Sequence, residues 1–298
     1  MTERAILELG SSAMRLVVGS INDAGRLQVS RKWSRHLRLG EAVFAHGSIP
    51  PELLEELNRM LSGLREDLMQ AHPGVSVQAY ATSAVRDAGN RGDVEALTSV
   101  LSDQPLRILS GSEEARALLE GVRHHYDLRQ TDAVLADLGG GSLELTCLRD
   151  GGVLAQYSLD CGTLRQGPCG RTLSERLRAL PESAQQPVPE LLLTGGNAKV
   201  LGTLLPELLG SEEVQVQGEM EVVVSGEAFL KGQSALQPTT PQERMERWSL
   251  RPHQSQVLTP ALEIFGELVT FFQPQRVRML SMALKEALFF WEEGDPVR

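Results

Sequence analysis

Two stretches of this sequence share one pattern: Leu7-Glu-Leu-Gly-Ser-Ser12 and Ala136-Asp-Leu-Gly-Gly-Gly-Ser142. In each, an apolar segment carries a carboxylate two residues before the first glycine, and a second apolar segment follows the Gly/Ser turn. Apolar segments of this length on either side of a turn predict paired strands. Because the carboxylate has the same offset in both stretches, we interpret them as copies of one unit and not as two unrelated hairpins.

Each copy opens a run of three predicted strands. Further strands and helices follow, indicated by short aliphatic runs and by leucines at helical spacing. The predicted strands are residues 4–10, 14–21, 26–32, 75–81 and 106–109, then 132–138, 143–149, 152–158, 190–194 and 275–281. The predicted helices are residues 50–71, 93–102, 112–125, 197–205, 255–272 and 283–293. Residues 165–190 give no clear prediction, and residues 237–242 are expected to form a loop.

This order of elements predicts an α/β fold in which helices cover mixed sheets. The repeat divides the chain into two domains, residues 1–123 and residues 124–298, each of a duplicated βββαβα type. Two such domains are expected to face each other across a cleft into which both Gly/Ser turns look.

The composition excludes several classes of protein. The chain has 298 residues, and 29 Lys and Arg against 39 Asp and Glu give a formal net charge of −10. A hydrophobic fraction of 41% is enough for a packed core, which excludes a wholly disordered chain. The acidic balance weighs against a nucleic-acid-binding protein. A site for an anion must then supply its own local positive potential.

No uninterrupted apolar run approaches the roughly 18 residues of a membrane span, and the N-terminus lacks the basic start and long apolar stretch of a signal peptide. The three cysteines form no Cys-x-x-Cys pair, so neither a disulfide framework nor a zinc site is indicated. The six histidines show no metal-ligand spacing either. We therefore expect a cytoplasmic protein with no membrane partner.

The second Gly/Ser turn has the composition of a phosphate-binding turn. Consecutive backbone N–H groups in Gly139-Gly140-Gly141-Ser142 can form an anion nest, because glycine permits close approach and positive φ. Asp137 precedes the turn and Glu144 follows it on the paired strand. Carboxylate oxygens beside a phosphate site are what Mg²⁺ uses, usually with several waters retained. The alternative is that both carboxylates cap backbone groups or pair with arginines.

Two further segments carry groups suited to phosphate chemistry. Thr82, Ser83 and Arg86 follow a predicted strand and offer donors to phosphate oxygens, although the same residues also suit an ordinary helix start. Glu113 and Glu114 follow Ser110 or Ser112 at a predicted helix N-terminus, where carboxylates usually complement the helix dipole. One of the two could instead serve as the base for an attacking water, and spacing alone does not choose between them.

Taken together, the motifs resemble those of one known family. They occur in the order Leu7–Leu16, Ala81–Ala88, Ser110–Arg116, Ala136–Leu145 and Thr194–Ala198, followed by a similar terminal segment at Ser281–Leu288. The same succession is typical of the exopolyphosphatase / guanosine pentaphosphate phosphohydrolase (Ppx/GppA) family, whose members share the actin-like (ribonuclease H-like) fold of acetate and sugar kinases. The resemblance covers residues 6 to about 200 and the terminal segment.

The resemblance implies two actin-like domains with the active site between them. It implies Mg²⁺-dependent release of the terminal phosphate from inorganic polyphosphate or from pppGpp. Glu114 then corresponds to the proposed base for water and Arg86 to a catalytic, phosphate-contacting arginine. The implied metal ligands are Asp137, Glu144 and Glu8, and the implied substrate-binding residues are Gly10, Ser11, Ser12, Arg15, Thr82, Ser83, Gly139, Gly140, Gly141, Ser142, Gly195 and Gly196.

Several positions depart from the family pattern. The first turn usually reads Asp-x-Gly-Ser-Asn-Ser, whereas this chain has Glu8, Ser12 and Ala13, and Gln254-Ser-Gln256 stands where an Arg-Ala-Asp run is common. We therefore expect a working phosphohydrolase with altered substrate choice. One alternative is a catalytically weakened regulatory protein that binds polyphosphate or (p)ppGpp, and another is a kinase or ATPase of the same fold. The sequence does not decide whether the chain forms a homodimer.

Overall fold

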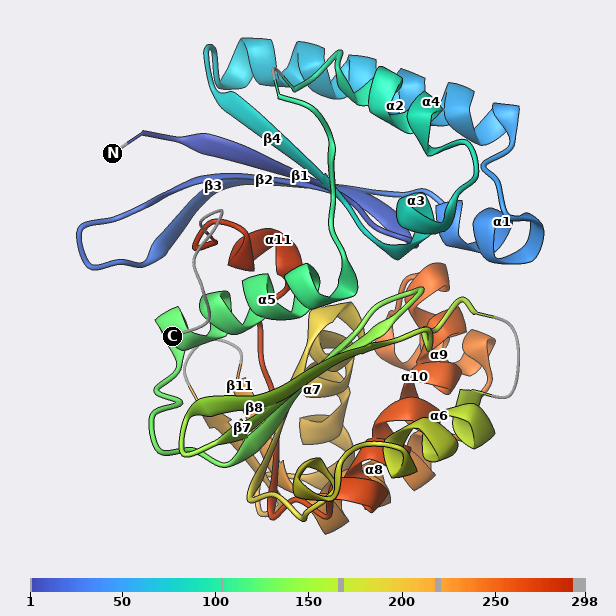
Figure 1. Cartoon of the computed structure of the whole chain (residues 1–298). Coiled ribbons are helices and arrows are strands. Elements are labelled where there is room, and N and C mark those ends of the chain that lie inside the picture. Colours follow the sequence, from blue (N-terminus) through green and yellow to red (C-terminus); the bar gives the residue numbers. More distant parts are fainter. Residues whose placement is uncertain (1, 103, 166–168, 218–220, 292–298) are drawn as a thin grey trace. The chain divides into compact units, whose positions relative to one another are not determined.

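The structure is a computed structural model, and it describes residues 2–102, 104–165, 169–217 and 221–291 (Figure 1). The described residues form two compact units. The first contains the residues up to 127, residues 164–165 and residues 284–291, and the rest belongs to the second. The sequence suggested a single boundary at residues 123/124 instead. Residues 284–291 belong to the first unit because Leu284, Leu288, Phe289 and Phe290 pack into one of its apolar cores.

The first unit is built on a five-stranded sheet with the spatial order β3-β2-β1-β4-β5. Its strands are β1 (Arg4–Leu9), β2 (Ala13–Ile21), β3 (Leu27–His36), β4 (Ser76–Ala81) and β5 (Arg107–Ile108). The first three are antiparallel neighbours, whereas β4 pairs in parallel with β1 and β5 in parallel with β4. The predicted three-strand meander is therefore confirmed.

Successive side chains of a strand point to opposite faces of the sheet, and both faces of this sheet carry apolar side chains. Odd-numbered residues of β1 pack against the helices α1 (Leu39–His46), α2 (Pro51–Ala71), α3 (Ser83–Asp87) and α4 (Arg91–Thr98). Ile6 on the opposite face packs with residues of α5 (Gly111–His125) and α11 (Leu284–Ala287). Figure 1 shows α2 and α4 over one side of the sheet, and α5 beside α11 over the other. Each face buries leucine-rich surface, which is the main source of stability of such a layer.

The second unit contains a seven-stranded sheet with the order β10-β11-β12-β9-β6-β7-β8. Its strands are β6 (Ala133–Leu138), β7 (Leu143–Arg149), β8 (Gly152–Leu159), β9 (Glu190–Thr194), β10 (Val214–Gln217), β11 (Glu221–Ser225) and β12 (Arg276–Met279). The series β8-β7-β6-β9 repeats the order and directions of β3-β2-β1-β4. The internal repeat predicted from the two Gly/Ser stretches is thus present in the topology.

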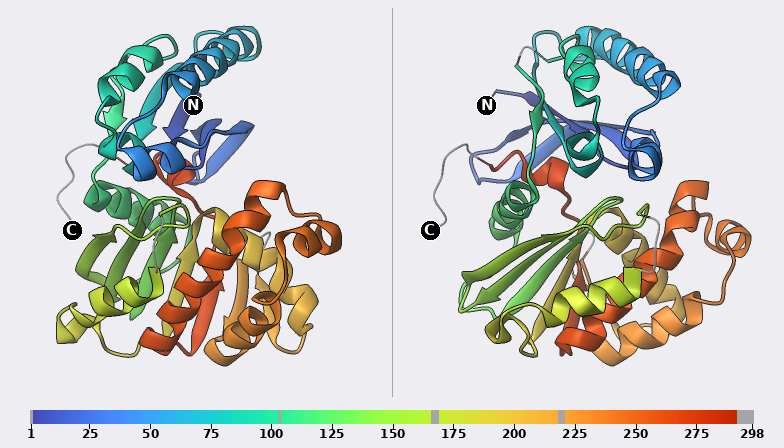
Figure 2. Two further views of the ribbon diagram at one scale, coloured as in Figure 1. Left: turned by 90° about the vertical axis from the view of Figure 1, so that its right-hand side faces the viewer. Right: turned by 45° about the vertical axis from the view of Figure 1, so that its right-hand side comes forward.

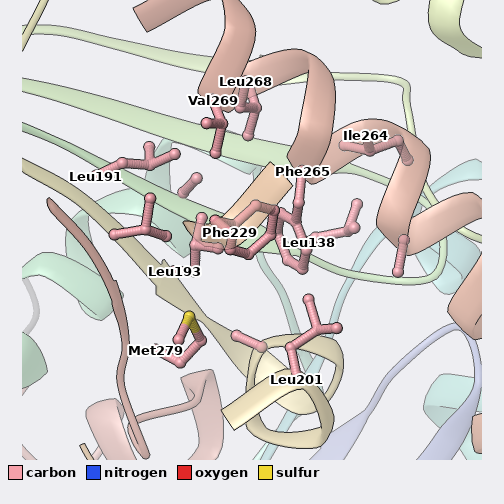
Figure 3. Packing of buried hydrophobic residues seen from close by; sticks show 14 of the residues in the cluster. Leu138, Leu191, Leu193, Leu201, Phe229, Ile264, Phe265, Leu268, Val269 and Met279 are labelled. Atoms are coloured by element: carbon pink, nitrogen blue, oxygen red, sulfur yellow. The ribbon is translucent and has the colours of Figure 1, made fainter. Parts of the chain in front are cut away.

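One face of the second sheet carries a large apolar core. Four helices contribute to it: α6 (Cys169–Arg178), α7 (Gly195–Leu209), α8 (Gly226–Leu236) and α10 (Pro252–Phe272). Figure 2 shows α10, in orange to red, lying along the sheet. In the close view of Figure 3, Phe229 and Phe265 lie among leucines of β9 and residues of α10. Even-numbered residues of β6 point into this core, so Asp137 lies on the opposite face.

Several short elements were not predicted from the sequence. They are α1, α6, β10, β11, α8, α9 (Pro241–Trp248) and the 3₁₀ turn η1 (Glu182–Ala184), whereas α3 begins at the helix start that Thr82, Ser83 and Arg86 allowed. The expected loop at residues 237–242 is shorter, because Pro241 occupies the first turn of α9 and a Thr240–Glu243 capping box starts that helix. The expected terminal helix at 283–293 is limited to α11 within the described residues. Arg244 on α9 is wholly buried, with its guanidinium donating to Thr239, Thr259 and main-chain carbonyls.

Of the helices in the described part of the chain, none combines the length and apolar composition that crossing a bilayer takes. Cys147 is a buried free thiol, whereas Cys161 is disulfide-bonded. The expectation of no disulfide therefore needs correction at Cys161. Linear spacing carries no information on which thiols meet after folding.

Candidate functional site

The first Gly/Ser turn connects β1 to β2 and is fixed by hydrogen bonds. The Gly10 amide donates to the Ala13 carbonyl at 3.0 Å, which closes the turn. The buried Ser11 hydroxyl lies 2.9 Å from the Ser83 hydroxyl. The Thr82 amide donates to the carbonyl of the last β1 residue. These contacts bring the first motif and the second motif together, although they are more than 70 positions apart in the sequence.

Arg86 and Glu114 form the central ion pair of the first unit. Arg86 Nη1 lies 2.6 Å from Glu114 Oε1 and 2.6 Å from the Leu109 carbonyl oxygen. Glu114 is buried in the first turn of α5, with its side chain 9% exposed, whereas the side chain of Arg86 is 24% exposed. The helix N-terminus and the guanidinium both favour the charged form of the carboxylate. The pair therefore places a carboxylate and an arginine together, and the arginine is partly open to solvent.

The neighbouring Glu113 has a different role. It forms a capping box with Ser110, accepting from the Ser110 amide at 2.8 Å, and it pairs with Arg107 at 2.8 Å. Burial alone would raise the pKa of Glu113, but hydrogen bonds from Arg107 and Ser110 outweigh it and lower the pKa to about 2. The structure thus distinguishes two adjacent glutamates that spacing left equivalent. Glu113 starts the helix, and Glu114 faces Arg86.

Glu8 and Arg15 are paired with each other. They are direct cross-strand partners on β1 and β2, and Arg15 Nη1 lies 3.3 Å from Glu8 Oε1. Glu8 is largely buried, whereas Arg15 is about one third exposed. Any role of Glu8 toward a metal, or of Arg15 toward a substrate, would have to compete with this ion pair.

The second Gly/Ser turn connects β6 to β7 in the second unit. The Gly139 amide donates to the Ser142 carbonyl at 3.0 Å, and the Thr163 amide donates to the Gly139 carbonyl at 3.2 Å. Gly162 packs so closely on this turn that an added Cβ would lie 2.3 Å from the Gly140 carbonyl oxygen. A second segment of the chain, residues 162–163, therefore packs directly against this turn.

Asp137 and Glu144 lie side by side at the ends of β6 and β7. They are direct cross-strand partners, so both side chains project from the face opposite to the apolar core. Asp137 Oδ1 accepts from Thr194 Oγ1, and Glu144 Oε1 accepts from Ser158 Oγ, each at 3.0 Å. Two carboxylates directly opposite each other repel, unless a proton or a cation neutralises them.

This pair fits a magnesium ion. No group of three His, Cys, Asp or Glu side chains suited to hold a metal occurs among the described residues. Mg²⁺, however, is commonly bound by only one or two carboxylates, with waters and substrate phosphate as its other ligands. Asp137 and Glu144 supply that number of carboxylates, next to a turn whose amides suit phosphate. Two carboxylates this close together favour a positive charge beside them.

Gly195 and Gly196 begin α7 directly after β9. Gly195 has a φ of +85°, and an added Cβ would lie 2.6 Å from Asp137 Oδ1, so a side chain here would collide with that carboxylate. Gly196 has open space around its Cα. Asn197 Nδ2 donates to the Leu138 carbonyl at 3.2 Å, which ties the start of α7 to the end of β6. This glycine pair thus lies beside Asp137 in the second unit.

The predicted residues therefore form two sets, one in each unit. The first set contains Glu8, Gly10, Ser11, Ser12, Arg15, Thr82, Ser83, Arg86 and Glu114, and the second contains Asp137, Gly139, Gly140, Gly141, Ser142, Glu144, Gly195 and Gly196. Sequence reasoning missed the hydroxyls of Thr194 and Ser158. Pairing the predicted strands in register, with Ser158 opposite Glu144, would have revealed one of them.

The unusual Gln254-Ser-Gln256 run has a local structural explanation. Gln254 Oε1 accepts from the Arg251 amide at 3.0 Å, which satisfies a backbone donor at the start of α10. Ser255 is completely buried, and its hydroxyl donates to the Pro241 carbonyl at 2.7 Å. This segment therefore connects the start of α10 to α9.

Comparison with solved structures shows the same fold over nearly the whole chain. An exopolyphosphatase from Cytophaga hutchinsonii matches with a TM-score of 0.82 and 18% identity, covering 96% of both chains. The Ppx/GppA family member of Aquifex aeolicus matches with a TM-score of 0.76 and 20% identity, covering 97% of this chain and 96% of that one. At such identities the likeness establishes the fold that this chain shares with the two proteins.

Sequence comparison gives a nearer relative over part of the chain. The "Exopolyphosphatase 2" of Mycobacterium tuberculosis is 31% identical over 173 residues, which is 55% of this chain and 54% of that protein. The chain thus spans about half the length of the curated relative it matches. The sequence model of the Ppx/GppA phosphatase family matches residues 17–294. The motifs, the duplicated topology and this match together show that the chain belongs to the Ppx/GppA phosphatase family.

Proposed function

We propose that this chain is a Mg²⁺-dependent phosphohydrolase that releases the terminal phosphate of inorganic polyphosphate or of pppGpp. The observation that carries the proposal is the Arg86–Glu114 pair, 2.6 Å apart, with Glu114 buried in the first turn of α5 and Arg86 partly exposed. Hydrolysis of a phosphoanhydride needs a deprotonated, positioned water and neutralised phosphate oxygens. A carboxylate in contact with a partly exposed arginine supplies both functions in one place.

In this proposal Glu114 accepts the proton of the attacking water, and Arg86 binds an oxygen of the phosphoryl group. One of the Ser11 and Ser83 hydroxyls donates to the other, which holds both segments in place. The second hydroxyl and the turn amides of the first unit are then the donors to substrate oxygens. Arg15 is the remaining candidate cation of this unit, and it would act only when released from Glu8.

Asp137 and Glu144 hold Mg²⁺ in the proposal, and the Gly139–Ser142 turn binds phosphate oxygens through its amides. A bound Mg²⁺ would neutralise charge on the phosphate oxygens and so favour attack. Glu8 is a weaker candidate ligand, since its charge is already balanced by Arg15 at 3.3 Å.

The competing proposal is a regulatory protein that binds polyphosphate or (p)ppGpp and turns it over slowly. It is motivated by Ser12 and Ala13, which replace an amide and a hydroxyl donor of the family pattern in the first turn. Loss of a donor to the developing charge costs catalysis more than it costs ground-state binding.

One assay distinguishes the two proposals. The purified chain is incubated with polyphosphate of graded length, pppGpp or ATP, in Mg²⁺ and in EDTA, and phosphate release is followed. We expect Mg²⁺-dependent release from polyphosphate or pppGpp and little from ATP. Tight binding of one of these anions without release from any would support the regulatory protein and would refute the hydrolase.

The metal assignment has its own test. Asp137→Asn removes one of two charged hard ligands while preserving the shape of the side chain. We expect the Mg²⁺ concentration for half-maximal rate to rise by about tenfold or more. An unchanged Mg²⁺ requirement would show that Asp137 is not a ligand.

A further inference from the structure

The carboxylate pair of the second unit belongs to a longer row of side chains. The register places Thr194 of β9 beside Asp137 of β6, Asp137 beside Glu144 of β7, and Glu144 beside Ser158 of β8. Four adjacent strands thus contribute hydroxyl, carboxylate, carboxylate and hydroxyl, in that order, on the face opposite to the apolar core. We call these four residues the carboxylate row.

Each hydroxyl of the row contacts the nearer carboxylate. Thr194 Oγ1 lies 3.0 Å from Asp137 Oδ1 and 3.3 Å from the Ala136 carbonyl oxygen, and it is completely buried. On the other flank, Ser158 Oγ lies 3.0 Å from Glu144 Oε1. A neutral hydroxyl that donates to a carboxylate fixes its rotation without cancelling its charge. The row is therefore built to keep two negative charges together in a defined orientation.

The corresponding row of the first unit is built differently. The register of β3, β2, β1 and β4 places Ser34, Arg15, Glu8 and Tyr80 side by side. Arg15 stands where the second unit has Glu144, and it neutralises Glu8 at 3.3 Å. The same fold position thus carries an acidic and a basic side chain in one unit and two acidic side chains in the other. This contrast shows that the repeated topology does not itself demand paired carboxylates.

We propose that Thr194 and Ser158 are positioning residues that hold the Asp137 and Glu144 carboxylates in the orientation that binds a divalent cation. The inference rests on the proposed function, because it takes these two carboxylates as the metal ligands. Outer hydrogen-bond partners of metal ligands typically contribute 10- to 100-fold in metal affinity. Buried Thr194 should contribute more than Ser158, which lies exposed on the edge strand β8.

The test measures cation binding directly, with Mn²⁺ as the spectroscopic probe and Mg²⁺ as the competitor. The variants are Thr194→Val and Ser158→Ala, each of which removes a hydroxyl and little else. Thr194→Ser keeps the hydroxyl and serves as the rescue. Thr146→Val is the matched control, since Thr146 is a buried threonine on the same face of β7 whose hydroxyl accepts from Gln156 Nε2 at 3.1 Å.

We expect Thr194→Val to weaken Mn²⁺ binding by about 10- to 100-fold and Ser158→Ala by about tenfold or less. Thr194→Ser and Thr146→Val should bind Mn²⁺ nearly as the unmodified chain does. At saturating Mg²⁺ the turnover of Thr194→Val should recover, so that the loss lies in the metal requirement. Thermal unfolding of each variant separates this effect from a loss of folded protein.

Two results would overturn the inference. One is Mn²⁺ affinity of Thr194→Val and Ser158→Ala no lower than that of Thr146→Val, while Asp137→Asn lowers it. The other is that Asp137→Asn itself leaves Mn²⁺ affinity unchanged, because the row then holds no cation. If instead Mn²⁺ binds as expected but no substrate releases phosphate, the proposed function fails while the assignment of the two hydroxyls is retained.

Discussion

Glu113 and Glu114 are adjacent on α5, and substituting them one at a time should have different effects. We expect the change at Glu113 to lower stability and the change at Glu114 to lower turnover. Glu113→Ala removes the acceptor of three hydrogen bonds, from the Ser110 amide, the Ser110 hydroxyl and Arg107, each at 2.8 Å. The side chain of Glu113 is 24% exposed, so solvent weakens each contact. We expect a loss of about 1–2 kcal/mol in the free energy of unfolding, with turnover changed little.

Glu114→Gln keeps the shape of the side chain and an oxygen facing Arg86, but it removes the base. Turnover should fall by roughly 10²–10⁴-fold, which corresponds to about 2.7–5.5 kcal/mol in activation free energy. Binding of the anionic substrate should persist, because a negative charge near the phosphoryl group is gone. Phosphate release and thermal unfolding are measured on both variants in the same buffer.

The pH dependence provides an independent check on Glu113. Its pKa is lowered from 4.5 to about 2, so its contribution to stability is complete above pH 4.5 and is lost as the pH falls toward 2. The stability difference between the unmodified chain and Glu113→Ala should therefore shrink over that range. Full turnover in Glu114→Gln, or an equal loss of turnover in folded Glu113→Ala, would refute the assignment of roles.

Three further outcomes are expected. Gly195→Ala should lower the free energy of unfolding by about 1–3 kcal/mol and weaken cation binding, because Gly195 has a φ of +85° and the new Cβ would collide with Asp137. Thermal unfolding measures the loss of stability, and Gly196→Ala is the control because Gly196 has open space around it. Arg244→Ala should destabilise the second unit by about 3–5 kcal/mol in urea unfolding, since it leaves a cavity and unpaired buried carbonyls. Burial raises the pKa of Cys147 to about 11, so iodoacetamide should label this thiol very slowly at neutral pH, as peptide mass spectrometry can show.

Much of the fold could be predicted because local patterns and the repeat agree. The strands around both Gly/Ser turns and the long helices have clear periodicity, and the structure confirms them. The short helix α1 could not be recognised, because eight residues give too few turns for a periodic signal. The division of the chain was equally inaccessible, since the return of residues 284–290 to the first unit depends on tertiary packing.

The sequence predicted which residues make up the candidate site, but not which of their side chains contact each other. Sequence could not show that Glu8 faces Arg15, because that contact depends on the register of β1 and β2. Spacing could not separate Glu113 from Glu114 either, since their difference arises from which way each side chain leaves the helix, and only the family resemblance pointed to Glu114. The hydroxyl of Thr194 escaped attention because a threonine at a strand end has no distinctive local signal.

The late position of residues 284–290 has a consequence for synthesis on the ribosome. Leu284, Leu288 and Phe289 complete the core that covers Ile6 and Tyr80, which were translated first. Until residues 284–290 have emerged, that surface of the nascent protein is only partly covered, and chaperones that recognise exposed apolar segments have time to bind it. Ribosome-bound chains that stop before residue 284 should therefore associate with such chaperones more strongly than chains that extend past residue 290.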